Sequence, residues 1–377
     1  MPSRASSWQR VERLLVVRLD NLGDVLMATP AIAALRAGLP RARITLLTSP
    51  SGAAAVPFLA DVDESIVFSA PWVKSAEGPH DDALGRVEID LVLQLAASRF
   101  DAVVIFTTCT QSVLPAALLC RMAGIPLRLG HCRENPYELL TDCVRDPDVI
   151  ADGMRHEVER QLALVASVGF GIDDQRLRFR VPGPAHDAVA DRLARAGIAR
   201  GAPYVVVHPG ATAESRRYPA HLFGLAAAQI ARDAGVAIVL SGAAQDRALV
   251  EEVRAAMASP ALSLAGQLDL GELAALIDGA ELLVANNSGP AHLAAALGTP
   301  VVDLYALTNP QHTPWHVPSR VLNHPVPCRN CLKSVCPMGH HDCLRRVEPA
   351  EVAAAAMELL AASRDGAFAS TCQVQHR

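Results

Sequence analysis

Lysine, aromatic residues and long apolar runs are all scarce in this sequence of 377 residues. Lysine occurs only at Lys74 and Lys333, so nearly every cation is an arginine. Aromatic residues make up 4% of the chain, and the formal net charge at pH 7 is −5. Scarce aromatic rings disfavour a stacking platform for single-stranded nucleic acid, and the negative net charge provides no global basic field. We therefore expect no nucleic-acid partner.

Segments that would direct a chain into a membrane are also missing from the sequence. Residues 1–12 are polar and lack the apolar stretch of a signal peptide. No run of about 18 apolar residues is present, so we expect no transmembrane helix. The cysteines number nine, an odd count, and five of them are scattered, which is typical of a reducing compartment. These features predict a cytoplasmic protein.

Apolar material is abundant, because 51% of the residues are hydrophobic and only 19% are charged. Disordered chains have low hydrophobicity and high net charge, so this composition excludes disorder as the dominant state. At roughly 100–200 residues per domain, the length predicts about two domains.

Apolar runs of strand length alternate with longer helical patterns, and this alternation predicts parallel sheets covered on both faces. The expected strands are residues 14–17, 44–47, 65–68, 102–106, 204–207, 237–240, 282–284 and 301–304. The expected helices are residues 24–37, 111–123, 219–233, 245–257, 271–278, 290–297 and 348–362. Residues 71–85 are expected to form a loop, and residues 169–184, rich in glycine, proline and charge, an interdomain linker. We therefore predict two doubly wound α/β domains, residues 1–175 and 176–377.

Ligands of such sheets bind outside the carboxyl ends of the strands, so the loops that follow strands are the informative ones. The first of these loops contains Asn21, Gly23 and Asp24 at the start of an expected helix. One interpretation makes Asp24 a helix N-cap, which contributes about 0.5–2 kcal/mol. The other makes it a general base at the edge of the sheet, because hydrogen bonds from a helix N-terminus keep a carboxylate ionised.

Two loops of the second half carry groups suited to phosphate. Residues 208–219 provide a glycine, the hydroxyls of Thr212 and Ser215, and two arginines that include Arg216. Residues 286–292 place Ser288 and Gly289 before a helix that begins near a proline. Free N–H groups, hydroxyls and guanidinium are the components of an anion site, and the pair favours a nucleotide diphosphate. A solvated basic turn and ordinary helix capping are the alternatives. A P-loop and a strand-bound G-x-G-x-x-G are both absent from the sequence.

Taken together, four stretches resemble the heptosyltransferase family of lipopolysaccharide biosynthesis, glycosyltransferase family 9. They are LLVVRLDNLGDVLMATP (residues 14–30), HEVER (156–160), HPGATAESRRYP (208–219) and VANNSGPAHLA (284–294). The resemblance covers nearly the whole chain in the same order.

The resemblance implies a GT-B fold, with two Rossmann-like domains facing a central cleft and no cofactor or metal. An N-terminal domain would hold a lipid-linked lipopolysaccharide acceptor, and a C-terminal domain would hold ADP-heptose. Transfer would invert the anomeric carbon, with Asp24 as catalytic base and Asn21 and Gly23 in the acceptor loop. The implied donor-binding residues are Thr212, Ser215, Arg216, Asp246, Asn287, Ser288, Gly289 and His292.

At two positions the chain departs from the family's pattern, which often has lysine in place of Arg216 and aspartate in place of Asn287. Arginine keeps the cation and adds a planar fork, so phosphate binding is expected to survive. Asparagine carries no charge, so either it still orients the heptose hydroxyls or the sugar preference differs.

A cysteine-rich segment, residues 328–343, contains Cys328, Cys331, Cys336 and Cys343 together with two histidines. The spacing is compatible with a structural metal, with an oxidisable pair or with reduced packing thiols, and we predict no metal. A similar stretch occurs in family members that add the second heptose, which favours that step here.

Several other functions remain open at this point. They are a transferase of the same fold that uses another nucleotide sugar, a nucleotide-sugar-binding protein without turnover, and a redox or metal sensor.

A lipid-linked acceptor implies peripheral contact with the inner face of the cytoplasmic membrane. Arg36, Arg41 and Arg43 form either a basic edge for anionic lipid or a solvated helix end.

Overall fold

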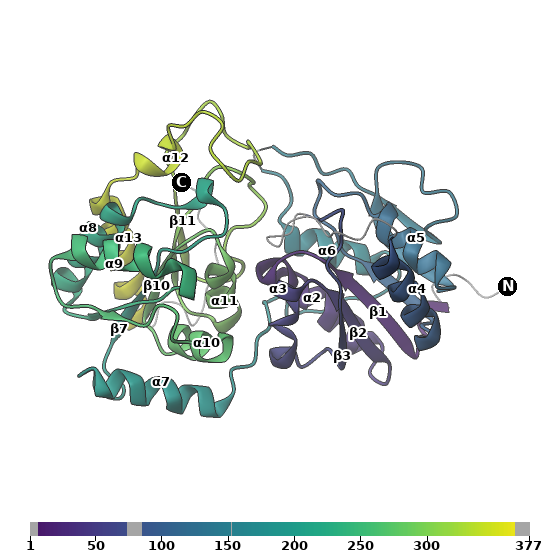
Figure 1. The fold of residues 1–377 in the computed structure, drawn as a ribbon, viewed down its shortest axis with the longest axis horizontal. Helices are drawn as coiled ribbons and strands as arrows, with labels where there is room; N and C mark the ends of the chain where they lie inside the picture. Colours follow the sequence, from purple (N-terminus) through teal and green to yellow (C-terminus); the bar gives the residue numbers. More distant parts are fainter. Residues whose placement is uncertain (1–6, 74–84, 152, 366–377) are drawn as a thin grey trace. The chain divides into compact units, whose positions relative to one another are not determined.

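A computed structural model describes residues 7–73, 85–151 and 153–365 of the chain. The chain divides into two compact units, Met1–Arg178 and Phe179–Arg377 (Figure 1). This division falls inside the glycine- and proline-rich segment 169–184. Most of the expected loop 71–85 lies outside the described residues.

The first unit is built on a parallel sheet of six strands in the order β3-β2-β1-β4-β5-β6. The strands are β1 (Arg13–Arg18), β2 (Arg43–Thr48), β3 (Glu64–Val67), β4 (Ala102–Ile105), β5 (Leu127–Cys132) and β6 (Asp142–Arg145). The helices are α2 (Leu22–Gly38), α3 (Pro50–Ala53), η1 (Val56–Phe58), α4 (Arg86–Ser98), α5 (Leu114–Met122) and α6 (Glu157–Ala166).

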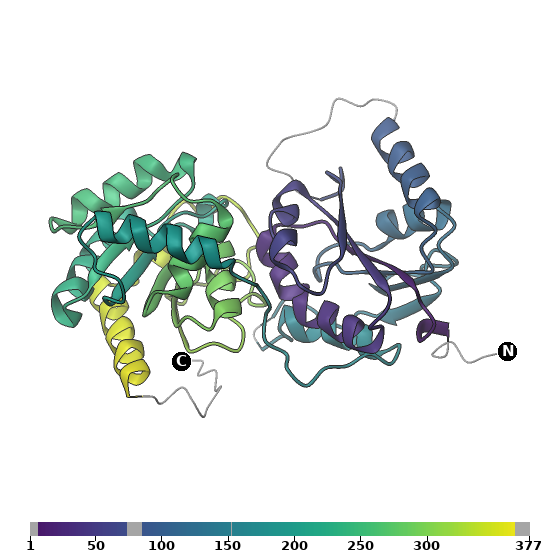
Figure 2. The same ribbon diagram turned by 90° about the horizontal axis from the view of Figure 1, so that it is seen from below.

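Helices cover both faces of this first sheet, which explains why its central strands are continuous apolar runs. Leu15 and Val17 of β1 belong to a buried cluster with Leu91 of α4 and Ala117 of α5. Alternate strand residues point to opposite faces, and on the other face α2 packs against α6 (Figure 2). Burial on both faces is what a parallel sheet requires.

The second unit repeats this architecture with the strand order β12-β11-β10-β7-β8-β9, again entirely parallel in its pairing. Its strands are β7 (Tyr204–His208), β8 (Ala237–Leu240), β9 (Leu262–Ser263), β10 (Leu282–Asn286), β11 (Val301–Leu304) and β12 (Ser319–Leu322). Its helices are α7 (Gly183–Arg195), η2 (Glu214–Arg216), α8 (Ala220–Ala234), η3 (Ala244–Asp246), α9 (Arg247–Met257), α10 (Leu270–Asp278), α11 (Gly289–Leu297), α12 (Asp342–Arg345) and α13 (Pro349–Arg364).

The main core of the second unit lies between its sheet and the helices α8, α9 and α13. Val205 and Val207 of β7 pack there with Phe223 of α8, Val253 of α9 and Leu359 of α13. Helices α7, α10 and α11 form a second packed group. Both units therefore have the doubly wound α/β architecture expected from the sequence.

The sequence pattern located the central elements and missed peripheral ones. The strands expected at 14–17, 44–47 and 301–304 are present as β1, β2 and β11. Strands β5, β6, β9 and β12 and helices α4, α6 and α7 were not expected. Several of these strands carry polar or charged residues, such as Arg128 in β5 and Asp142 in β6, which interrupt the apolar pattern.

Among the described residues, no helix combines the length and apolarity needed to cross a bilayer.

Close packing between α8 and α9 makes Gly224 sensitive to substitution. A Cβ atom at this position would lie 2.5 Å from Cβ of Ala256 and 2.6 Å from the Val253 carbonyl oxygen. We expect Gly224→Ala to lower the free energy of unfolding by about 1–3 kcal/mol, because the two helices must separate. Thermal unfolding followed by circular dichroism measures the change. Gly183→Ala is the control, since a Cβ there meets nothing within 4 Å, and an equal loss in both variants would contradict the packing argument.

Candidate functional site

In the first unit, Asp24 lies at the carboxyl edge of the sheet, in the first turn of α2. The helix begins at Leu22 with Asn21 as its N-cap, so Asp24 is the third helical residue and not the cap itself. The Asn21 backbone N–H donates to Oδ2 of Asp24 at 3.2 Å. The side chain of Asp24 is 14% exposed, which leaves it accessible at the sheet edge. Asp24 thus supports the helix start while a part of its carboxylate still faces solvent.

Arg18, the last residue of β1, ties this loop to the interior. Its guanidinium is fully buried and forms ion pairs with three carboxylates: Nε with Asp20 at 3.0 Å, Nη2 with Asp24 at 3.2 Å and Nη1 with Glu157 at 2.9 Å. Gln111, in the loop after β4, donates to Oδ1 of Asp20 at 2.5 Å. Because β4 neighbours β1 in the sheet, loops from adjacent strands meet around one arginine.

Burial and charge oppose each other throughout this cluster. Burial works against the charge on Arg18, but the carboxylates of Asp20, Glu157 and Asp24 together raise the pKa of its guanidinium. Burial also raises the pKa of the Asp20 and Glu157 carboxyls, and the charge of Arg18 opposes that rise in both. The cluster is therefore rich in negative charge around a cation that stays protonated.

In the second unit, the two loops expected to bind phosphate meet at the carboxyl edge of the sheet. Asn286, at the end of β10, donates from Nδ2 to the Pro209 carbonyl at 2.7 Å and accepts the Tyr218 N–H at 2.9 Å. Its side chain is fully buried. The Ser288 hydroxyl lies 3.4 Å from the Gly210 carbonyl and 3.1 Å from the Asn286 carbonyl. The loops after β7 and β10 are thus joined by hydrogen bonds.

Charged and polar groups surround the end of β11 beside these loops. Asp303 is fully buried, and neither of its carboxylate oxygens has a hydrogen-bond partner among the described residues. Burial raises the pKa of the Asp303 carboxyl well above its usual range, and the charge of Arg216 opposes the rise. Burial raises the pKa of the Tyr305 hydroxyl, and Arg216 and Asn287 oppose that rise. The half-buried Arg216 is therefore near enough for its charge to act on a buried carboxylate.

The remaining predicted donor residues are distributed around the same edge. Thr212 is exposed, Gly289 opens α11, and His292 is buried in the first turn of α11. Asn287 is buried, and its N–H donates to the Leu304 carbonyl of the adjacent strand β11 at 3.3 Å. Asp246 is buried and accepts the Ala243 N–H at 3.1 Å, so one of its oxygens already supports the start of η3, which leads into α9.

Ser215 points away from the open edge and binds the cysteine-rich segment. Its hydroxyl donates to the Lys333 carbonyl at 2.6 Å, and its N–H donates to the Ser334 carbonyl at 2.9 Å. Leu332 also donates from its N–H to the Thr308 carbonyl at 3.0 Å, in the loop after β11. Segment 328–343 therefore supports two loops of the site from behind. Its part in the site could not be deduced from the spacing of its thiols.

The four clustered cysteines are free thiols in this structure. Burial and the neighbouring thiols of Cys336, Cys328 and Cys331 raise the pKa of Cys343. The Cys328 sulfur lies 3.7 Å from Nε2 of His340. Within the described ranges, no group of three or more His, Cys, Asp or Glu side chains is arranged to hold a metal ion.

His208, at the end of β7, is a buried histidine behind the loop expected to bind phosphate. Its Nδ1 lies 3.0 Å from the Ser241 hydroxyl. Burial lowers the pKa of His208 to about 4, and the charge of Asp246 opposes that shift. A Cβ at Gly210 would lie 2.5 Å from Oδ2 of Asp246 and 3.2 Å from Nε2 of His208, so a larger residue at this turn would displace the Asp246 side chain.

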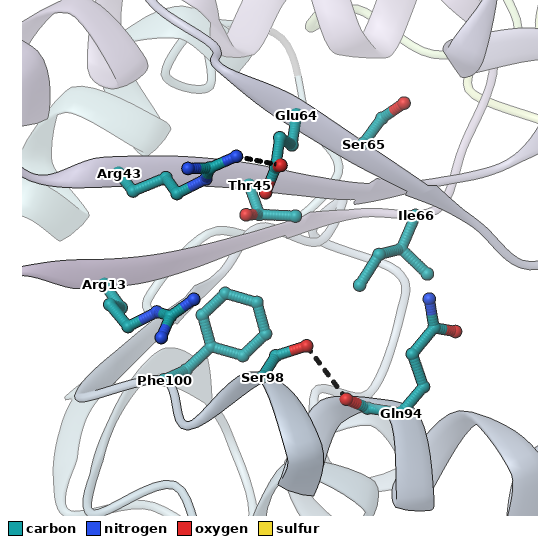
Figure 3. Close-up of a pocket in the computed structure, with 9 residues that line it drawn as sticks. All are labelled: Arg13, Arg43, Thr45, Glu64, Ser65, Ile66, Gln94, Ser98 and Phe100. Atoms are coloured by element: carbon teal, nitrogen blue, oxygen red, sulfur yellow. Dashed lines mark hydrogen bonds and ion pairs between the residues drawn. The ribbon is translucent and has the colours of Figure 1, made fainter.

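A pocket of about 350 Å³ lies at the opposite, amino edge of the first sheet (Figure 3). Arg13, Arg43 and Glu64, at the starts of β1, β2 and β3, line it, and Arg43 pairs with Glu64. Arg36 pairs with Asp63 at 2.6 Å. Two of the three arginines suggested as a basic edge are therefore neutralised by carboxylates, which weakens that interpretation.

Sequence reasoning missed the buried charges that position the site. Asp303 had a usable signal, because it is a lone acidic residue within the apolar run Val301–Leu304. Arg18 and Glu157 stand in two of the stretches that resemble the family, but their pairing had no signal, since they are separated by 139 positions and meet only in the folded unit.

Comparisons with known proteins agree with this geometry. A family model described as glycosyltransferase family 9 (heptosyltransferase) matches residues 89–341. The chain is 29% identical over 340 residues to lipopolysaccharide heptosyltransferase 1 of Pseudomonas aeruginosa, covering 86% of this chain and 87% of that protein.

Two solved structures share the fold. A family 9 glycosyl transferase from Veillonella parvula superimposes with a TM-score of 0.77 at 22% identity, covering 93% of this chain and 97% of that one. The structure titled E. coli ADP-heptose lps heptosyltransferase II gives a TM-score of 0.70 at 24% identity, covering 93% and 99%. The predicted class of two Rossmann-like parallel-sheet domains is confirmed.

The depressed pKa of His208 predicts a specific acid sensitivity. The unfolded chain binds a proton near the ordinary histidine pKa of about 6.5, whereas the folded unit resists protonation down to about pH 4. Stability linked to His208 is therefore complete above pH 6.5 and is lost as the pH falls from 6.5 to 4, on the order of 3 kcal/mol in all. We expect His208→Asn to remove this part of the pH dependence, measured by urea unfolding across that range. His221→Gln, at an exposed position, is the control, and an unchanged slope in His208→Asn would refute the assignment.

Proposed function

The chain belongs to glycosyltransferase family 9, the heptosyltransferases, and from this premise we propose that it moves a heptose from ADP-heptose to the inner core of lipopolysaccharide. The observation that carries the proposal is the pair of joined loops at the carboxyl edge of the second sheet. Gly210, Thr212 and Arg216 in one loop, and Ser288 and Gly289 in the other, offer the donors that a diphosphate requires.

The names of the relatives support the donor and the acceptor class. One solved neighbour is titled an ADP-heptose lps heptosyltransferase II, and a curated relative is a lipopolysaccharide heptosyltransferase 1. Among family members, the cysteine-rich segment 328–343 favours the addition of the second heptose. The proposed acceptor is therefore a core that already carries one heptose, and contact with the membrane that bears it is peripheral.

Asp24 is the proposed catalytic base. Its ion pair with Arg18 holds the carboxylate in place, and its partial exposure leaves it open to an acceptor hydroxyl. As the acceptor oxygen attacks C1 of the heptose, its proton passes to Asp24 and the bond from C1 to the diphosphate breaks. A single displacement of this kind inverts the anomeric carbon and needs no covalent intermediate. Asn21 and Gly23 shape the loop that carries the base.

The leaving ADP develops negative charge on its β-phosphate, and the second unit supplies the groups that stabilise it. Arg216, the Thr212 hydroxyl and the start of α11 are the proposed donors. Asp246, beside the same edge, is the proposed partner of the ribose hydroxyls through its remaining oxygen. Asn287 and His292 are proposed to orient the heptose and support the loop, and Ser215 acts by holding the loop to segment 328–343.

Removal of the Asp24 carboxylate tests the proposed base. We expect Asp24→Asn to lower transfer by about 10²- to 10⁴-fold, the usual contribution of general base catalysis, with nucleotide affinity nearly unchanged. The assay follows transfer from ADP-heptose to a core acceptor that carries one heptose. Asp90→Asn, an exposed carboxylate on α4, should transfer at the wild-type rate. Wild-type turnover in Asp24→Asn would eliminate this role.

Calorimetric titration with ADP, UDP and GDP tests the nucleotide site. We expect selective ADP binding, weakened roughly 10- to 100-fold by Arg216→Ala, because a charged hydrogen bond contributes about 1.5–3 kcal/mol. Arg254→Ala on α9, which removes an exposed arginine paired with Glu251, serves as the matched control.

The other nucleotides distinguish the alternative functions. A preference for UDP or GDP would keep the glycosyltransferase but replace the donor. ADP binding without any transfer would favour a nucleotide-sugar-binding protein. An ADP affinity that is equal in Arg216→Ala and the wild type would place the phosphates elsewhere.

A further inference from the structure

Behind Asp24 lies a second acidic residue that the proposed reaction has not used. Glu157, the first residue of α6, is fully buried and pairs through Oε1 with Nη1 of Arg18 at 2.9 Å. On the same guanidinium, Nη2 pairs with Oδ1 of Asp24 at 3.2 Å. A buried carboxylate and the part-exposed Asp24 are therefore connected through one fully buried cation.

Glu157 is not needed merely to neutralise Arg18. Asp20 and Asp24 already pair with that guanidinium, so Glu157 is the third carboxylate around one cation. Placing a further carboxylate in the interior is costly, because burial disfavours its charge. Gln161 offsets part of this cost by donating to Oε1 of Glu157 at 2.6 Å, one turn along α6. A costly group supported by its own hydrogen bond indicates a role beyond charge balance.

That role follows from what Arg18 does to Asp24. The Arg18 guanidinium lies 3.2 Å from the Asp24 carboxylate and so fixes the direction of that side chain. The Glu157 carboxylate, paired with the other side of the cation, fixes the direction of the guanidinium, and its charge also interacts with that of Asp24. We propose that Glu157 is a positioning residue that acts through Arg18 to orient Asp24, and that its negative charge acts on the Asp24 carboxylate. The proposal rests on the function of Asp24 given above.

Other charged and titratable groups face the same cluster. Asp20, in the loop after β1, adds a further negative charge beside Arg18. Arg160, on α6, opposes the effect of burial on Glu157, as Arg18 does. Burial raises the pKa of the Cys109 thiol, in the loop after β4, and the charge of Glu157 raises it further. None of these groups is changed in the variants below, so their contributions remain constant.

The pH profile of kcat/KM in Glu157→Gln tests the proposal. Glu157→Gln removes a negative charge that repels the charge on Asp24. In this variant Asp24 should therefore lose its proton more readily and be a weaker base. We expect the acid limb of the profile to move to lower pH and kcat near neutral pH to fall roughly tenfold, as a misdirected base would produce. KM for the nucleotide sugar should stay within about twofold, because the donor loops belong to the other unit.

Two further variants separate positioning from folding. Glu157→Asp keeps the charge, so its acid limb should return to the wild-type pH even where kcat stays low. Gln161→Met removes the amide that supports the Glu157 charge and should shift the limb in the same direction as Glu157→Gln, by less. If Glu157→Gln does not fold, the position of the acid limb in Gln161→Met tests the proposal instead. Glu138→Gln, at a surface pair with Arg121, is the control and should leave the profile unchanged.

The outcomes distinguish this proposal from the function on which it rests. If Asp24→Asn is inactive and the acid limb is identical in wild type, Glu157→Gln and Gln161→Met, the role of Glu157 is overturned while the base assignment stands. If Asp24→Asn transfers normally, the proposed function fails instead. An activity loss that only follows the unfolded fraction, with an unmoved limb, also overturns the positioning role.

Discussion

Parallel strand pairing is the constraint on which the site depends. In each unit it brings the carboxyl ends of adjacent strands to one edge, where loops distant in sequence meet. A single buried side chain at a strand end then ties those loops together. Arg18 does so by ion pairs with Asp20, Asp24 and Glu157, and Asn286 does so by two hydrogen bonds to the loop after β7. The scaffold is apolar, whereas the site is positioned by buried polar groups.

Both units place charge where burial makes it expensive. Glu157 in the first unit and Asp303 in the second are fully buried carboxyls with raised pKa values, and the charge of an arginine, Arg18 or Arg216, opposes the rise in each. Such groups contribute little net stability, because desolvation offsets the attraction between the charges. What these groups contribute is orientation. The attraction to a buried carboxylate restricts an arginine side chain to one orientation before substrate binds. Pre-organisation of this kind suits a reaction that relies on placed charges rather than on a covalent intermediate.

Part of the site could be predicted because its residues are contiguous. Asn21, Gly23 and Asp24 lie in one loop, and Ser288 and Gly289 lie in another, each directly after an apolar strand. Their resemblance to glycosyltransferase family 9 identified the chemistry. Ser215 shows the limit of such reasoning, because its residue type fits a phosphate loop while its donors bind Lys333 and Ser334. The direction of a hydroxyl in a loop is set by the residues that pack around it, and these come together only in the folded chain.

The sequence by itself determined the two parallel α/β units and the loops that matter, since apolar runs and their spacing depend on local order. The peripheral strands β5, β6, β9 and β12 were decided by tertiary structure, because they are polar or short and form only against an existing sheet. The same holds for the partners of Asp24 and Arg216. Glu157 is 139 positions from Arg18, and only the packing of α6 against α2 brings these charges together. Charge interactions act through space, so the chain's order alone could not reveal them.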